Sequence, residues 1–124
     1  MFYSLKKDTH ISIYGMHGYV TSTGLNKRVE LNTSGTVFVK VLDYEGRTLQ
    51  ELCDKLLEIF VGVERSAILN DAENFYDNLV HDGFLVSGES IKELDSKDKS
   101  LRNAQPHIEK DSINFLSVSK EIII

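Results

Sequence analysis

The residue types that most often carry chemistry are present in this chain, but their spacing does not form a catalytic or metal-binding set. The single cysteine, Cys53, falls on the apolar stripe of a predicted helix, which favours a buried core thiol over a nucleophile. The four histidines are scattered and form no His-x-His, His-x-x-x-His or Cys–His pair with metal-ligand spacing. They are His10, His17, His81 and His107.

Acidic residues and glycines also lack the arrangement that chemistry requires. Asp71, Glu73, Asp77 and Asp82 lie on the polar side of a predicted helix, where a solvated face explains them better than a carboxylate pair does. The glycines near the N-terminus do not open a helix after a strand, so no phosphate-binding loop is indicated. We therefore expect a binding protein with no catalytic residues, no metal and no cofactor.

Composition limits the class of partner and the compartment. A chain of 124 residues suits one small domain with additional segments. Its net charge of −5, with histidines neutral, argues against nucleic acid, because affinity for phosphates depends on Lys and Arg. One cysteine cannot form an internal disulfide, and no stretch has the apolar length of a signal peptide or a membrane span. We expect a cytoplasmic protein that binds neither nucleic acid nor membrane.

Residues 1–31 are predicted to form strands. "HISIY" (10–14) alternates polar and apolar side chains with the period of a half-buried strand. "GYVTST" (18–23) is rich in β-branched and aromatic residues, "KRVEL" (27–31) is predicted to be the third strand, and "GLNKR" (24–28) is typical of a turn. Three short strands in one antiparallel sheet are the expectation.

Two helices are predicted between residues 32 and 62. Asn32 or Thr33 can cap the first, which Gly46 is expected to end. The second begins with a capping box, in which Thr48 is the N-cap and Glu51 stands three residues later. Its apolar face is regular, and a glycine at position 62 is expected to end it.

A third helix is predicted from Ser66 to Asp82, followed by a short extended "FLV" piece (84–86). Its apolar stripe spans roughly 140°, wider than the ~100° that one core contact requires. One edge carries Ile68, Phe75 and Leu79, and the other carries Leu69, Tyr76 and Val80. Two interpretations stay open: the helix packs on two neighbours, or one edge faces the core while the other lines a groove.

The amino-acid composition of the chain changes after residue 88. Residues 89–112 are polar and charged and contain the single proline, so we interpret them as a linker. Residues 113–124, "INFLSVSKEIII", return to strand-forming types. An apolar strand beyond a linker must find a sheet edge, on its own chain or on a neighbouring one. The predicted organisation is a domain over 1–88, a linker over 89–112 and a strand-like tail over 113–124.

The order of turn and apolar residues over about residues 26–88 resembles the PqqD-like family (pyrroloquinoline quinone biosynthesis protein D). In that family a Leu-Asn pair precedes the first helix, a Gly-x-Thr turn precedes a Leu-rich helix, and the third helix closes on Leu-x-x-x-Gly with an apolar pair. The residues that match this pattern are Leu31, Asn32, Gly46, Thr48, Leu49, Leu52, Leu79, Gly83, Phe84 and Leu85.

The resemblance implies a fold, a function and partners. The fold would be α+β, a small winged helix-turn-helix-like domain with a three-stranded antiparallel sheet followed by three helices. The function would be to bind the leader segment of a ribosomally made precursor peptide by β-strand addition. The domain would present that leader to a modifying enzyme, often a radical S-adenosylmethionine maturase, in cis or in trans.

The same resemblance implies where the peptide binds: alongside the third predicted strand and against the third helix. Free N–H and C=O groups of an edge strand support such addition physically, with pockets giving selectivity. Lys27 and Arg28 could meet an acidic leader residue, although a solvated pair is the plainer interpretation. The predicted peptide-binding residues are Lys27, Arg28, Val29, Glu30, Leu31, Leu69, Ala72, Tyr76 and Val80.

Two alternatives and one hypothesis about the tail remain. A winged-helix DNA-binding regulator would need basic and amide side chains on its third helix, whereas this one is acidic. The chain could also be the front of a radical maturase, with the tail as its next strand. We hypothesise that the tail occupies a sheet edge in place of a leader, either its own edge or that of a second copy, which would give a homodimer.

Overall fold

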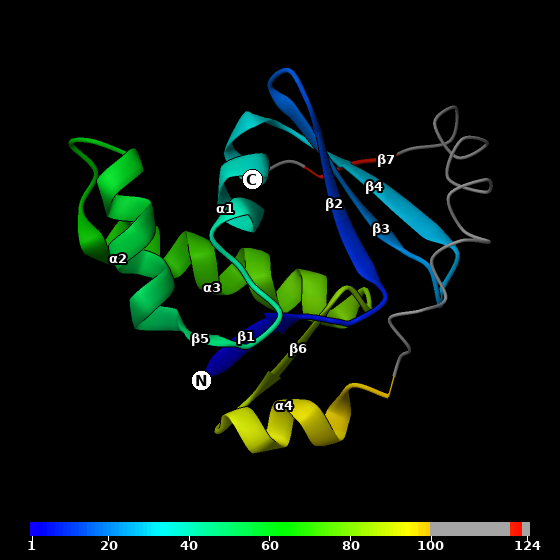
Figure 1. The fold of residues 1–124 in the computed structure, drawn as a ribbon. Helices are drawn as coiled ribbons and strands as arrows, with labels where there is room; N and C mark the ends of the chain where they lie inside the picture. The colour runs from blue at the N-terminus through cyan, green and yellow to red at the C-terminus, as the bar shows by residue number, and fades with distance from the viewer. Residues whose placement is uncertain (100–119, 123–124) are drawn as a thin grey trace.

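A computed structural model describes residues 1–99 and the backbone of residues 120–122 (Figure 1). The strands are β1 (Phe2–Leu5), β2 (Thr9–Tyr14), β3 (His17–Ser22), β4 (Lys27–Leu31), β5 (Arg47–Thr48), β6 (Leu85–Gly88) and β7 (Lys120–Ile122). The helices are α1 (Thr33–Lys40), α2 (Leu49–Ile59), α3 (Arg65–His81) and α4 (Ile91–Lys97).

The strands form two separate sheets. The larger has the order β2-β3-β4-β7, with antiparallel pairing among the first three strands and parallel pairing between β4 and β7. The smaller has the order β5-β1-β6 and is antiparallel throughout. In Figure 1, α3 runs across the middle of the molecule between the two sheets, and α4 covers the far side of the smaller one. The α+β prediction is confirmed, and the predicted three-stranded antiparallel sheet corresponds to β2, β3 and β4, whereas the smaller sheet was not predicted.

Aromatic rings join the helices to the smaller sheet at the centre of the core. Tyr3 of β1 lies 5.5 Å from Tyr76 of α3, and Phe38 of α1 lies 5.4 Å from Phe75, both measured between ring centroids. The Tyr76 hydroxyl donates a hydrogen bond of 2.7 Å to the carbonyl of Phe38. Such edge-on and tilted ring contacts suit aromatic quadrupoles, and the buried hydroxyl has the acceptor that it requires.

The first helix ends earlier than the sequence indicates. Asn32 caps α1, as predicted, with its side chain accepting from the backbone N–H of residue 35. The helix stops at Lys40 rather than continuing to Gly46. Asp43 explains the early exit: its carbonyl accepts from the N–H of Leu5 in β1, and its side chain accepts from the N–H of Gly46. Tertiary pairing with an unpredicted strand therefore outweighs the local helical pattern.

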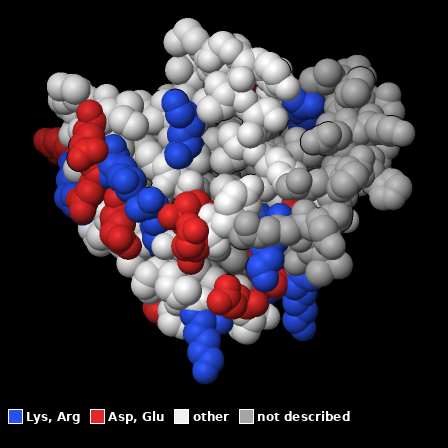
Figure 2. Space-filling view, in the orientation of Figure 1, with Lys and Arg blue, Asp and Glu red and all other residues white. Residues whose placement is uncertain are grey.

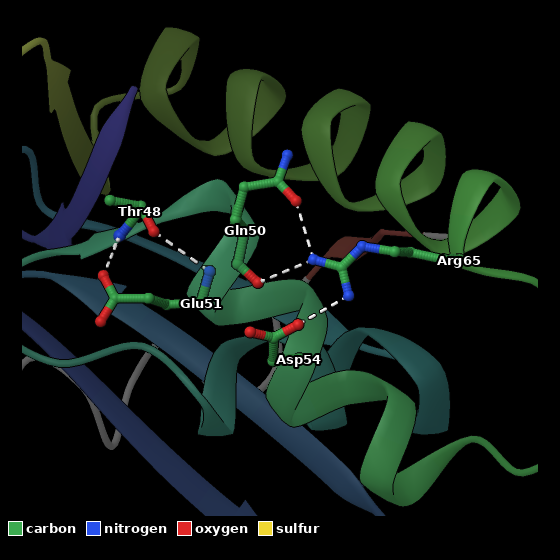
Figure 3. Close-up of polar contacts among 5 residues, drawn as sticks. All are labelled: Thr48, Gln50, Glu51, Asp54 and Arg65. Carbon is green, nitrogen blue, oxygen red and sulfur yellow. Dashed lines mark hydrogen bonds and ion pairs between the residues drawn. The ribbon is translucent and has the colours of Figure 1, made fainter.

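The second helix begins as its sequence predicts, and a cross-helix contact joins it to the third (Figure 3). The Thr48 hydroxyl accepts from the N–H of Glu51, and the Glu51 carboxylate accepts from the N–H of Thr48, which completes the capping box. Hydrogen bonds from Thr48 lower the pKa of the Glu51 carboxyl. Arg65, the first residue of α3, donates to Asp54 at 2.6 Å and to the side chain of Gln50 at 2.7 Å. This contact fixes the start of α3 against α2.

A fourth helix lies inside the segment predicted to be a linker, so that prediction is wrong for residues 91–97. The Ser90 side chain accepts from the N–H of Glu93, and the Glu93 carboxylate accepts from the N–H of Glu89. Leu94 is 2% exposed and anchors the helix to the smaller sheet. A Ser-x-x-Glu capping signal was present in the sequence, but the polar composition around it obscured a helix with one buried side chain.

No helix in the part of the chain that the structure describes is long and apolar enough to cross a membrane.

Candidate peptide-binding edge

Strand β4 has a different kind of neighbour on each side. On one side it pairs along its whole length with β3, with Leu31 opposite Gly18 and Lys27 opposite Ser22. On the other side it pairs with β7, in a parallel register that places Val29 level with Lys120 and Leu31 level with Ile122. The second ladder joins β4 to a strand that lies about 90 residues further along the chain. The outer edge of β4 is therefore a surface that accepts an added strand.

Successive side chains of β4 point to opposite faces of the sheet, and the two faces differ in chemistry. Leu31 is fully buried in the core, and Val29 is partly buried against it. On the opposite face, the Arg28 guanidinium stacks 4.1 Å from the ring centroid of Tyr19. The Tyr19 hydroxyl donates a 2.9 Å hydrogen bond to Glu30, which raises the pKa of that phenol. Val29 and Leu31 pack in the core, whereas Arg28 and Glu30 on the opposite face contact Tyr19 of β3.

The start of β4 lies at the C-terminal end of α3. Lys27 is exposed, and its ammonium sits 5.5 Å from the ring centroid of Phe84, which follows α3. Gly83 packs so closely on Leu25 that a Cβ at position 83 would fall 2.4 Å from the Leu25 Cδ1 atom. These contacts join the turn before β4 and the Lys27 side chain to residues that follow α3, and a groove between the β4 edge and α3 stays a prediction. Leu69 lies three turns before the C-terminal end of α3, about 16 Å along the helix from Val80.

The four predicted residues of α3 differ in how far a peptide could reach them. Ala72 and Tyr76 are both 0% exposed, and Tyr76 is held by Tyr3 and Phe38. Leu69 and Val80 are partly buried at the margin of the core. The interpretation of α3 as a helix packed on two neighbours therefore holds for Tyr76, and the interpretation as a groove wall applies at most to Leu69 and Val80. The role of all nine residues in peptide binding stays a prediction.

Sequence reasoning missed two contributors to this edge, Tyr19 and Phe84, whose rings contact Arg28 and Lys27 of β4. The signal for Tyr19 was its cross-strand position opposite Glu30. The hypothesis that the tail occupies a sheet edge is confirmed for the chain's own β4, because residues 120–122 pair there. The remaining tail residues lie outside the described part of the chain.

The structure describes Cys53, three of the four histidines and the acidic residues of α3 that were considered for chemistry. Cys53 is fully buried on α2, and burial raises the pKa of its thiol, which disfavours the nucleophilic thiolate. Among the described residues, no three His, Cys, Asp or Glu side chains lie close enough together to hold a metal ion. The described geometry supports strand addition at β4.

Comparison with known proteins identifies the family of the chain. The profile of the family described as coenzyme PQQ synthesis protein D (PqqD) matches residues 20–85, which is more than half of the chain. This protein belongs to the PqqD family. The solved structure titled "TbiB1 in Complex with the TbiA(beta) Leader Peptide" superimposes with a TM-score of 0.61 at 15% identity, covering 70% of this chain and 99% of that one. At this identity the likeness concerns the fold. No curated protein matches the chain.

The charge distribution bears on the DNA-binding alternative. On the face in Figure 2, Lys and Arg are interspersed with Asp and Glu. Asp71, Glu73 and Asp77 are exposed on α3, and Arg65 at its start is engaged by Asp54. A helix that enters the major groove needs basic and amide side chains on its outer face. Nothing in the family, the fold or these charges favours DNA binding.

Proposed function

We propose that this protein binds the leader segment of a ribosomally made precursor peptide and presents it to a modifying enzyme. The observation that carries the proposal is the β4 edge, which takes up a further strand by backbone pairing. Its support is membership of a family identified over residues 20–85 and a fold shared with TbiB1, a protein solved with a leader peptide. Backbone hydrogen bonds at such an edge provide affinity, and adjoining side chains provide selectivity.

The binding interface in this proposal combines the β4 edge with the partly buried flank of α3 that runs from Leu69 to Val80. Val29, Glu30 and Leu31 offer the backbone ladder, Val80 and Leu69 offer apolar contacts, and Lys27 attracts an acidic leader side chain. A few anchored apolar side chains at ~1.5–3 kcal/mol each, less the cost of ordering the peptide, give affinities near micromolar, roughly −8 kcal/mol.

The chain would act as a non-catalytic recognition domain. The modifying enzyme, in this proposal a radical S-adenosylmethionine maturase, would be a separate protein or a further part of the same polypeptide. Holding the leader places the rest of the precursor near the enzyme's active site at high effective concentration. The location of the protein in the cytoplasm belongs to the same proposal.

A calorimetric titration tests this function. The probe is a synthetic peptide with the sequence of the N-terminal half of a precursor encoded beside the gene, added to the full chain. We expect binding near micromolar, weakened up to about fivefold by Lys27→Glu, the scale of an exposed ion pair. Lys92→Glu, which changes an exposed lysine on α4, is the matched control and should not alter the affinity. Absence of binding to the unmodified chain would contradict the proposal.

A further inference from the structure

The tail strand occupies the same edge that the proposed peptide needs. Residues Lys120–Ile122 pair in parallel with the second half of β4, covering Val29, Glu30 and Leu31. A β-sheet edge presents one set of N–H and C=O groups, so it cannot pair with two strands at once. Tail and peptide therefore exclude each other at these three positions.

The pairing is short, which makes it displaceable. The ladder between β4 and β7 involves three residues of a five-residue strand, and in the described register it begins at Val29. An extended peptide that pairs along all of β4 would form more backbone hydrogen bonds than β7 does. Such a peptide could begin pairing near Lys27, at the end of β4 that the described ladder does not reach, and then replace β7 residue by residue.

The tail also has an advantage over a free peptide in binding to β4. Because β7 belongs to the same chain, its addition to β4 is an intramolecular step, for which effective concentrations are on the order of millimolar. A pairing too weak to form between separate molecules can then be substantially populated. The apparent dissociation constant of a competing peptide is the intrinsic one divided by the fraction of molecules whose edge is free.

We propose that the C-terminal strand β7 is a built-in competitor that lowers the affinity of the β4 edge for its peptide. This inference rests on the proposed function for the identity of the incoming peptide. The tail sets a threshold: a peptide with a few residues of matching backbone is excluded, and a longer extended segment displaces the tail. Specificity for long leader segments then follows from competition in addition to side-chain pockets.

The test changes the backbone of β7 in the full chain. Glu121→Pro combined with Ile122→Pro removes a ladder donor whichever of the two adjacent N–H groups faces β4, because alternate residues of a strand point toward a given neighbour. The matched control, Glu121→Ala with Ile122→Ala, keeps both N–H groups. Amide hydrogen exchange of β4 without peptide and calorimetric affinity for the precursor-derived peptide are measured on all three proteins.

We expect faster exchange of the outward-facing β4 amides and an affinity about three- to tenfold higher in the proline variant, with the alanine variant closer to the unmodified chain. Unchanged exchange and unchanged affinity in the proline variant would overturn the proposal. A dimer of the unmodified chain that the prolines convert to a monomer, seen by sedimentation, would also overturn it, because the tail would then serve a second copy.

Failure of the proposed function would be recognised separately. If the prolines accelerate exchange in β4 but no form of the protein binds the precursor-derived peptide, the tail does occupy the edge and the assignment of that peptide is wrong. A second probe, the synthetic peptide of residues 113–124, is then titrated into the proline variant. Binding of this probe, with renewed protection of β4, supports the tail as an edge ligand, and its absence counts against it.

Discussion

At the scale of single residues, the hydroxyl of Tyr76 connects the two helices at the centre of the core. It donates to the Phe38 carbonyl at 2.7 Å in a site with no solvent exposure. Tyr76→Phe would leave that carbonyl without its donor, at a cost of about 1–2 kcal/mol in the free energy of unfolding. Urea denaturation measures this, and Tyr14→Phe, at a residue 62% exposed, is the control expected to stay within ~0.5 kcal/mol. Equal losses in the free energy of unfolding from the two substitutions would contradict the stabilising role of the Tyr76 hydrogen bond.

The same phenol predicts a response to alkaline pH. Burial raises the pKa of Tyr76 above its usual value, and burial with a hydrogen bond to Asp77 raises that of Tyr3. Above a pH of ~10 the unfolded chain loses these protons while the folded protein keeps them, so the free energy of unfolding falls as pH rises. Urea curves at several pH values above 9 should show a shallower fall in Tyr76→Phe than in the unmodified chain. Identical slopes would show that this phenol ionises freely in the folded state.

Residue types and spacing in the sequence predicted part of the candidate site. The strand β4 and the core edge of α3 (Ile68, Phe75 and Leu79) follow from periodicity, because burial of one face of a strand or helix dictates the spacing of its apolar residues. Periodicity could not show that Tyr76 is enclosed, since this depends on β1, which ends 71 residues before Tyr76 and left no clear signal. Tyr76→Ala would therefore test folding, at about 3–5 kcal/mol, rather than peptide binding.

At the scale of elements, the close approach of α1 to β3 depends on Gly18. A Cβ at this position would lie 2.8 Å from the Thr36 hydroxyl oxygen and 3.0 Å from its methyl carbon. Gly18→Ala should push α1 away from the sheet that carries β4, at a cost of about 1–3 kcal/mol.

A double-mutant cycle separates this contact from other effects of alanine in a strand. Thr36→Ala removes the two nearest of the three side-chain atoms that the new methyl group would meet, so the pair should be less destabilised than the sum of the single variants. Thermal or urea unfolding of the four proteins gives the interaction free energy. Strict additivity would mean that crowding against Thr36 is not the cause.

The elements divide into those with strong local signals and those set by distant contacts. The capping box at Thr48 and the breaker Gly83 define α2 and the end of α3 in the sequence as in the structure. By contrast, β5 has two residues and exists because it pairs with Phe2 and Tyr3 of β1. Short strands of this kind carry no periodicity of their own, and the early end of α1 at Lys40 follows from the same long-range pairing.

At the scale of the whole molecule, the larger sheet ends on one side with β4 and its added partner β7 (Figure 1). Helix α1 packs on β2, β3 and β4, while α3 and α4 enclose the smaller sheet. The core thus fixes three strands of the larger sheet, and β7 pairs with the outer side of β4.

The central claim is that the proposed leader peptide adds to β4 as a strand, and backbone amide exchange tests it most directly. Exchange of Lys27–Leu31 is followed in the full chain with and without the precursor-derived peptide, by mass spectrometry or NMR. The account predicts added protection at alternate residues of β4, extending to the Lys27 end that β7 does not cover, with little change in α4. Tight binding of the peptide with unchanged protection in β4, and new protection elsewhere, would contradict it.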